Sequence, residues 1–230
     1  MKHRILLFVA LVFPLVFFVQ CGITTWSVSG DTLTIRGLGR MQTFGGKYPW
    51  GKYREKIRHI VIRDGVTSIG DEAFMSFSAL TSVRISRTVT SLGEEAFRNC
   101  SLLSSVVLPM RVKSLGTASF RNCRSLSSVV FPPGLRQIGR ESFAYCHSLT
   151  SISIPSSVTQ LGREAFHYCS ALTEVTVAWP NPPDIGNDVF FLQSLSFWET
   201  PVPLATLHVP PGSRPLYEKA RGWMSFGRIE

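Results

Sequence analysis

The stretch Leu92–Pro109 reads LGEEAFRNCSLLSSVVLP, and its pattern recurs every 23 residues along the chain. In each copy an aliphatic residue precedes a glycine, and a phenylalanine follows four residues after that glycine. The glycines and phenylalanines of five copies are Gly70 and Phe74, Gly93 and Phe97, Gly116 and Phe120, Gly139 and Phe143, and Gly162 and Phe166. A sixth copy, at Gly186 and Phe190, is displaced by one residue. Residues 66–190 are therefore a tandem repeat.

Each copy has the pattern expected for one turn of a coil. Val83 and Ile85 are two residues apart, which is the alternation of a strand with one buried face. In later copies a proline such as Pro109 ends the strand, because it has no N–H to donate. The glycine permits a tight or left-handed corner, and the following Glu-Ala-Phe segment is expected to be short helical or irregular. Only stacked copies can bury the apolar positions, so we predict a strand-rich α/β repeat solenoid.

Four cysteines occupy one column of the repeat, and Phe77 holds the same position in the first copy: Cys100, Cys123, Cys146 and Cys169. Neighbouring turns lie about 4.8 Å apart, so distance permits a disulfide, but parallel side chains do not favour its dihedral angle. Because Phe77 indicates an apolar column, we predict buried free thiols that form a structural ladder.

Two histidines, His147 and His167, lie near cysteines of that column. Residues beside an inward-pointing cysteine face elsewhere, so four zinc ligands would not converge. We predict no metal site and no cofactor.

The N-terminus has the features of an export signal. A basic start, Met1–Arg4, precedes an unbroken apolar run, Ile5–Val19, which is shorter than the roughly 20 residues of a membrane-spanning helix. Cys21 lies where a bacterial lipoprotein carries its lipidated cysteine, although Phe18–Gln20 lacks the usual small residues. We therefore expect an exported protein, at the cell surface or outer membrane or secreted, with Cys21 as the candidate lipidation site.

Two stretches of the repeat resemble the BspA-like leucine-rich repeats of bacterial surface proteins: Glu94–Ser101 and His147–Thr159. The resemblance implies a leucine-rich-repeat-type solenoid with about 23 residues per turn. It also implies display at the bacterial surface and adhesion to host proteins or other cells.

The flanking segments resemble the caps of such arrays. Trp26–Val28 with Leu33–Ile35 is similar to an N-terminal β-hairpin cap, and Leu207–Ser213 is similar to a C-terminal cap. A Cys-Gly at the start of the N-terminal cap recurs in this family, which offers a second interpretation of Cys21. We divide the chain into a signal peptide (1–20), an N-terminal cap (21–58), the solenoid (59–190) and a C-terminal cap (191–230).

The outward residues of the strands form a candidate partner-binding face. They are mostly small, with two valines that provide an exposed apolar spot. These residues are Ser82, Arg84, Ser105, Val107, Ser128, Val130, Ser151, Ser153, Glu174 and Thr176. The alternative is that Ser and Thr are soluble residues that merely suit strands.

Charge suggests a second candidate surface. The chain carries 24 basic and 15 acidic residues, and eight basic residues between Ser86 and Arg140 face only Glu94 and Glu95. The candidate anion-binding residues are Arg98, Arg111, Lys113, Arg121, Arg124, Arg136 and Arg140. An anionic glycan or lipid suits an exported protein better than nucleic acid, for which interleaved aromatics are absent. Solvated arginines screened by salt are the alternative explanation.

The sequence contains no recognisable catalytic motif. A glutamate recurs at one repeat position, as Glu72, Glu95, Glu141 and Glu164, which suggests a structural role near a helix N-terminus. We predict a non-enzymatic exported protein that binds a protein or an anionic glycan at the cell surface. The alternative is an envelope scaffold that makes contacts between bacterial proteins.

Overall fold

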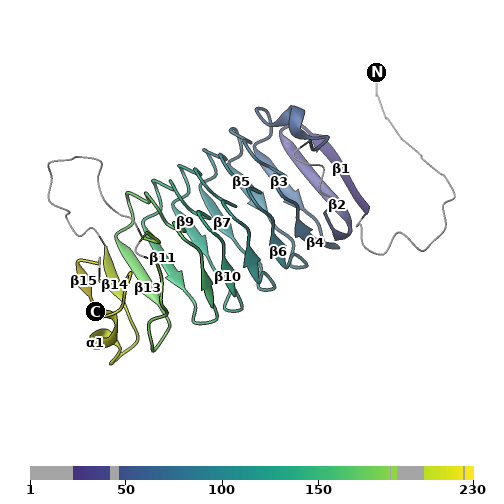
Figure 1. The fold of residues 1–230 in the computed structure, drawn as a ribbon. Coiled ribbons are helices and arrows are strands. Elements are labelled where there is room, and N and C mark those ends of the chain that lie inside the picture. Colours follow the sequence, from purple (N-terminus) through teal and green to yellow (C-terminus); the bar gives the residue numbers. More distant parts are fainter. Residues whose placement is uncertain (1–22, 42–46, 187, 191–204, 225) are drawn as a thin grey trace, which may run out of the picture.

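The computed structural model describes residues 23–41, 47–186, 188–190, 205–224 and 226–230. It is an elongated coil in which successive turns stack side by side from the N-terminal to the C-terminal end (Figure 1). The predicted solenoid is therefore confirmed. The signal segment, Cys21 and the candidate lipid anchor lie outside the described residues, and the division into four segments stays a prediction.

A β-hairpin closes the N-terminal end of the coil, as the family resemblance predicts. It consists of β1 (Ile23–Ser29) and β2 (Thr32–Arg40), which pair in antiparallel register through Trp26 and Ile35. A short 3-10 helix, η1 (Gly51–Tyr53), follows before the first turn. Since β2 also pairs in parallel with β3 and with β4, the hairpin continues both strand-bearing walls of the coil.

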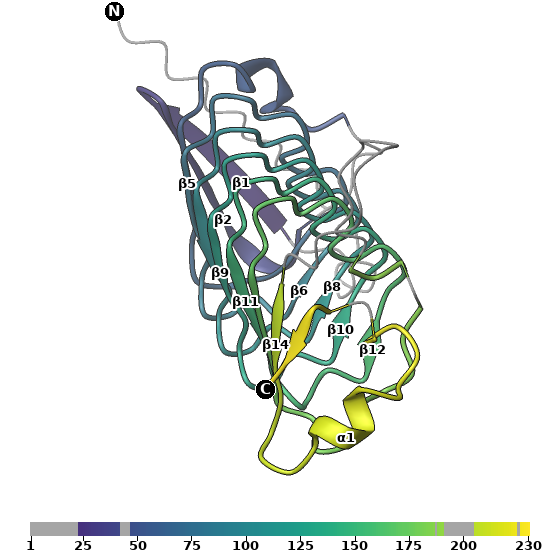
Figure 2. The same ribbon diagram turned by 90° about the vertical axis from the view of Figure 1, so that its left-hand side faces the viewer.

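One wall carries the longer strand of each turn. Pairing is parallel and advances by 23 residues, as where Ser105 pairs with Ser128 and Ser151 with Glu174. The strands are β3 (His59–Ile62), β5 (Ser82–Arg84), β7 (Ser105–Val107), β9 (Ser128–Val130), β11 (Ser151–Ile154), β13 (Glu174–Val177), β14 (Thr206–His208) and β15 (Arg228–Ile229). In Figure 2 this wall, with β5, β9, β11 and β14, forms one side of the coil.

A second wall carries a short strand of each turn, after the corner that the proline begins. Its strands are β4 (Val66–Ile69), β6 (Ser91–Leu92), β8 (Ser114–Leu115), β10 (Gln137–Ile138) and β12 (Gln160–Leu161). They also pair in parallel with the 23-residue offset. Both walls turn their apolar residues inward, so the core runs the whole length of the coil.

The third wall consists of turns and not of helices. Among the described residues the helical elements are η1 and α1 (Arg214–Tyr217), and both lie outside the repeat. In this wall Glu95 and Asn99 adopt left-handed backbone conformations, with φ of 51° and 61°. The Phe97 N–H, between them, donates to the Ser119 carbonyl of the next turn at 2.8 Å. The recurring glutamates therefore occupy left-handed turn positions, and the prediction that they lie near a helix N-terminus is wrong.

The glycine of the repeat is required by close approach and not by a left-handed conformation. A Cβ on Gly116 would lie 2.5 Å from the carbonyl carbon of Gly93 in the preceding turn, and Gly139 and Gly162 are equally close to their predecessors. None of these glycines has positive φ. Of the two predicted alternatives, the tight corner is correct and the left-handed glycine is wrong.

Phenylalanine side chains fill the interior beneath the third wall. The rings of Phe97, Phe120, Phe143 and Phe166 stack with centroids 5.3–5.4 Å apart and interplanar angles of 3–9°. All four are fully buried. A backbone repeat of one strand spacing per turn places identical rings face to face, so the phenylalanine column becomes a continuous stack.

The four cysteines of the repeat are buried free thiols, as predicted. Each thiol donates to a phenylalanine carbonyl of the preceding turn, for example Cys123 Sγ to Phe97 O at 3.2 Å. Burial raises the pKa of the Cys100 and Cys169 thiols to about 12. A column of neutral thiols therefore packs as small apolar side chains with a satisfied donor.

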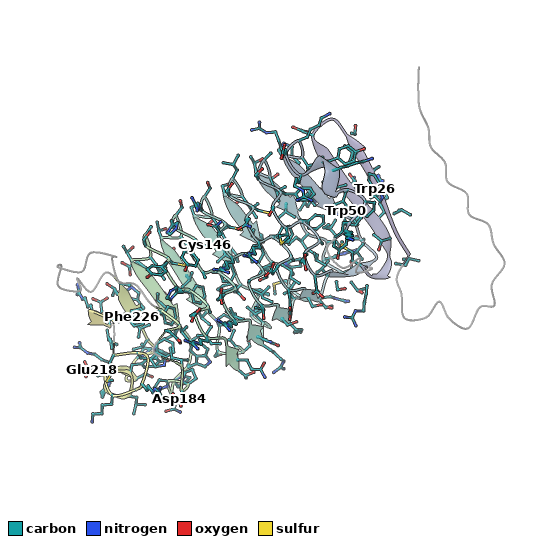
Figure 3. All side chains as sticks on the ribbon, turned by 45° about the horizontal axis from the view of Figure 1, so that its top comes forward. Trp26, Trp50, Cys146, Asp184, Glu218 and Phe226 are labelled. Atoms are coloured by element: carbon teal, nitrogen blue, oxygen red, sulfur yellow. The ribbon has the colours of Figure 1, made fainter. Side chains whose placement is uncertain are left out.

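Aromatic residues close both ends of the core. Figure 3 shows Trp26 and Trp50 at the N-terminal end and Phe226 at the other end. At the C-terminal end the Tyr217 hydroxyl donates to the Trp179 carbonyl at 2.8 Å, and Trp223 is fully buried. The apolar interior of the end turns is thus covered and not left open to water.

The structure bears on membrane insertion only for the residues that it describes. In that part of the chain no helix has the length and the apolar character needed to cross a bilayer.

Candidate binding surfaces

The strand face has the geometry that the sequence predicts. All ten outward positions from Ser82 to Thr176 are exposed, while alternate residues such as Val106 and Ile152 are buried. Because the register advances by 23 residues, each outward side chain lies beside its counterpart in the next turn. The face is therefore a set of continuous rows along the coil.

An apolar spot lies in the middle of this face. Val107 and Val130 are paired neighbours on β7 and β9, with exposed fractions of 67% and 57%. Met110, just after β7, is equally open, at 67%. Serines surround the valines in the adjacent row, so a partner's backbone has room to approach closely.

The two ends of the strand face carry different charges. Arg36, Arg63 and Arg84 are exposed on or just after β2, β3 and β5 at the N-terminal end. At the C-terminal end His208 lies between two carboxylates, with Nε2 against Glu174 and Nδ1 3.5 Å from Glu230. The sequence analysis missed Arg36 and Arg63, since both precede the recognised repeat copies.

Three of the seven predicted anion-binding residues already have carboxylate partners. Arg98 pairs with Glu95 of its own turn at 2.7 Å, and Arg121 reaches Glu141 of the next turn at 3.2 Å, because Ala118 replaces the glutamate of its own turn. Arg140 pairs with Glu141 at 3.0 Å. These pairs neutralise the column of like charges that the sequence suggested.

The other four candidates lack such neutralisation. Arg124 donates to the side chain of Asn122 at 2.9 Å. Arg111, Lys113 and Arg136 are exposed and form no ion pair within the described residues. They lie near the corner before the short strands β8 and β10, away from the third wall that carries Arg98 and Arg121. The seven residues therefore do not form a single patch.

No arrangement for catalysis or metal binding emerges in the ranges that the structure describes. Those ranges contain no group of three or more His, Cys, Asp or Glu residues that could hold a metal ion. The raised pKa values belong to buried groups: burial raises the pKa of the Tyr217 hydroxyl to about 12, as it does for the thiols, and also raises that of Tyr48. None of these groups lies in an open pocket.

Comparison with known proteins identifies the repeat. A family model described as BspA type leucine-rich repeat region matches six copies, over residues 52–173 and 96–207. A leucine-rich repeat protein of T. pallidum is similar in structure, with a TM-score of 0.53 and 22% identity over 90% of this chain and 78% of that one.

A second solved structure, a leucine-rich repeat protein from Bacteroides ovatus, has a TM-score of 0.55 and 22% identity. The match covers 90% of this chain and 51% of that one. At this identity the two likenesses concern the fold. None of the curated proteins matches the chain.

Proposed function

The chain belongs to the BspA-type leucine-rich repeat family, and on that premise we propose that it is an exported, non-enzymatic protein that binds a macromolecule at the bacterial cell surface. Repeat proteins of this kind present an extended surface, and their function resides in the residues that they display. A protein partner is the primary candidate, since the family suggests protein binding.

The observation that carries the proposal is the valine pair on the strand face. Val107 and Val130 are exposed although the same turns bury every apolar residue of the alternate positions. Exposed valines contribute nothing to the core, whereas a partner that covers them would remove apolar area from water, worth roughly 25 cal/mol per Å². The flanking serines keep the surface flat and polar, like the rim of a protein interface.

The experiment compares two charged substitutions on opposite walls of the coil. Val107→Glu with Val130→Glu alters the strand face, and Leu102→Glu, at a side chain 50% exposed on another wall, is the matched control. Saturable binding of the purified chain to immobilised extracellular matrix proteins is measured for each variant. We expect the valine variant to lose at least tenfold in affinity and the control to bind like wild type, with thermal unfolding unchanged in both.

The alternative function, an envelope scaffold, predicts a different partner. Cross-linking on intact bacteria followed by recovery of the chain would then yield envelope proteins, and matrix proteins would not bind saturably. Equal binding of the Val107→Glu, Val130→Glu variant and wild type would remove the strand face from the proposal under either function.

A lipid anchor at Cys21 stays a separate proposal. A fatty-acid probe supplied to growing cells is expected to label the wild type and not Cys21→Ala. An unlabelled wild type would favour Cys21 as part of the N-terminal cap.

A further inference from the structure

The largest hollow on the described surface lies at the N-terminal end of the coil and is rich in arginine. It has a volume of about 740 Å³ and is lined by Arg36, Arg63, Arg84 and Arg87, with backbone and side chains of Val61–Asp64 and Ile85–Ser86. Four guanidinium groups share this groove with one carboxylate, that of Asp64. We name it the arginine groove.

The strand register brings these arginines together. Ile35 of β2 pairs with Ile62 of β3, and both are buried, so the next residues, Arg36 and Arg63, emerge side by side. Arg84 of β5 pairs with Val61 and extends the groove by one strand. Neighbouring strands lie about 4.8 Å apart, so the like charges of Arg36 and Arg63 originate from adjacent backbones and repel one another.

The single carboxylate of the groove is already occupied. Asp64 accepts a hydrogen bond from the Ser86 hydroxyl at 2.6 Å and lies 3.6 Å from Arg87. Ser86 stands where later turns have Pro109 and its equivalents, so this hydroxyl is peculiar to the groove. Held by Ser86 and Arg87, Asp64 leaves the other arginines without a carboxylate.

The rest of the coil treats its arginines differently. On the third wall Arg98, Arg121 and Arg140 each pair with a glutamate of the same or the next turn. In the arginine groove Arg36 donates only to the Ser27 hydroxyl, at 3.1 Å, and neither Arg63 nor Arg84 forms an ion pair among the described residues. The fold thus neutralises arginines in one wall and leaves a concentrated positive charge in a hollow.

We propose that the arginine groove binds a sulfated glycan chain. Guanidinium groups bind sulfate and carboxylate oxyanions through paired N–H donors. Several cations in one open groove suit a flexible polyanion with more than one anionic group per sugar better than an isolated carboxylate. A protein partner would require an apolar contact core, and the apolar residues of the groove are buried or half-buried, as Ile62 is at 2%.

This inference adds a glycan site to the proposed binding function and does not depend on the valine pair. Calorimetric titration of the purified chain with a heparin oligosaccharide tests it, using Arg36→Ser/Arg63→Ser/Arg84→Ser as the groove variant. The control, Arg111→Ser/Lys113→Ser/Arg136→Ser, removes the same formal charge from exposed cations outside the groove. It also tests the earlier prediction of anion binding at those three residues.

We expect the groove variant to bind the oligosaccharide at least tenfold more weakly, and the control to change affinity less than threefold. Fully desulfated heparin is expected to bind weakly to the wild type. An equal loss in both variants, or no binding by the wild type, would overturn the proposal. Polyglutamate of matched charge binding as tightly as heparin would instead assign the groove to an acidic protein segment.

Folding and function are separable in this experiment. The substituted arginines are exposed, so thermal unfolding of the groove variant should match or exceed that of wild type as repulsion is relieved. Loss of heparin binding with unchanged matrix-protein binding would support the groove alone, and the converse would support the valine pair alone.

Discussion

The Trp50 indole N–H donates to the carbonyl of Ala73 at 2.8 Å. In later turns the equivalent carbonyl receives a backbone N–H from the turn before, as the Ala96 carbonyl does from Phe74 at 2.9 Å. The Tyr48 hydroxyl does the same for Asp71, also at 2.8 Å. Two aromatic side chains therefore replace a missing turn and satisfy the first carbonyls of the third wall.

Replacing Trp50 with phenylalanine should destabilise the chain by removing this donor. Trp50 is 1% exposed, and a buried carbonyl left without a partner costs about 1–3 kcal/mol. Urea unfolding followed by circular dichroism measures the change. Trp26→Phe is the control, because Trp26 is partly exposed and its ring is held by aromatic contacts; an equal loss in both variants would argue that ring volume matters and the hydrogen bond does not.

Gly116→Ala should disrupt the stacking of turns. The added Cβ would meet backbone atoms 2.5–2.6 Å away, which cannot move without shifting the neighbouring turn. We expect a loss of about 3 kcal/mol or more, and a lower melting temperature. At Gly51 the nearest atom is the flexible end of Arg54, at 3.4 Å, so Gly51→Ala should cost far less; similar melting temperatures for the two variants would contradict this account.

The thiol column should react only when the chain unfolds. The pKa of the Cys100 and Cys169 thiols is raised to about 12, so almost no thiolate is present at pH 8. In a Cys21→Ala background, a thiol reagent is expected to label the four cysteines at the rate of unfolding. Rapid labelling in native buffer would show that the column is open to solvent.

The same thiols make stability depend on pH at the alkaline end. Their folded pKa lies above the ordinary thiol value of about 8.5, so their contribution is complete below that pH and is lost as pH rises toward 12. Between pH 8 and pH 10.5, Cys100→Ala should lose less unfolding free energy than wild type. Identical losses would remove Cys100 from the explanation.

Arg121 and Arg136 are expected to respond in opposite ways to substitution with alanine. Arg121→Ala breaks the 3.2 Å pair with Glu141 and should reduce stability by up to about 1 kcal/mol. Arg136→Ala has no ion pair to break and should leave the urea midpoint unchanged. A larger loss for Arg136→Ala would contradict the assignment of Arg121 as the structural residue.

The periodic columns made most of the fold predictable. Once the 23-residue spacing of residues such as Phe97 and Cys100 is recognised, strand register, burial and the outward rows follow, because each turn must match the next. The left-handed backbone of Glu95 and Asn99 was not predictable, since both residues ordinarily prefer other conformations and only the inter-turn hydrogen bonds require it.

The candidate site was only partly predictable. Val107 and Val130 could be placed on the outer face from alternation alone. The charge of a surface depends on pairs between turns, and the partner of Arg121 is Glu141, which lies 20 residues later in the sequence. Arg36 and Arg63 lie outside the recognised copies, so their convergence with Arg84 became visible only with the register of β2, β3 and β5.

The stacked phenylalanines have a consequence for how such a protein changes its reach. Because Phe120 meets Phe97 and Phe143 in nearly the same way, a duplicated or deleted 23-residue unit would leave matching surfaces on both sides. Each unit would lengthen or shorten the molecule by one strand spacing, about 4.8 Å, while both ends stay closed. The coil is a ruler whose number of divisions can vary by whole units without redesign of the fold.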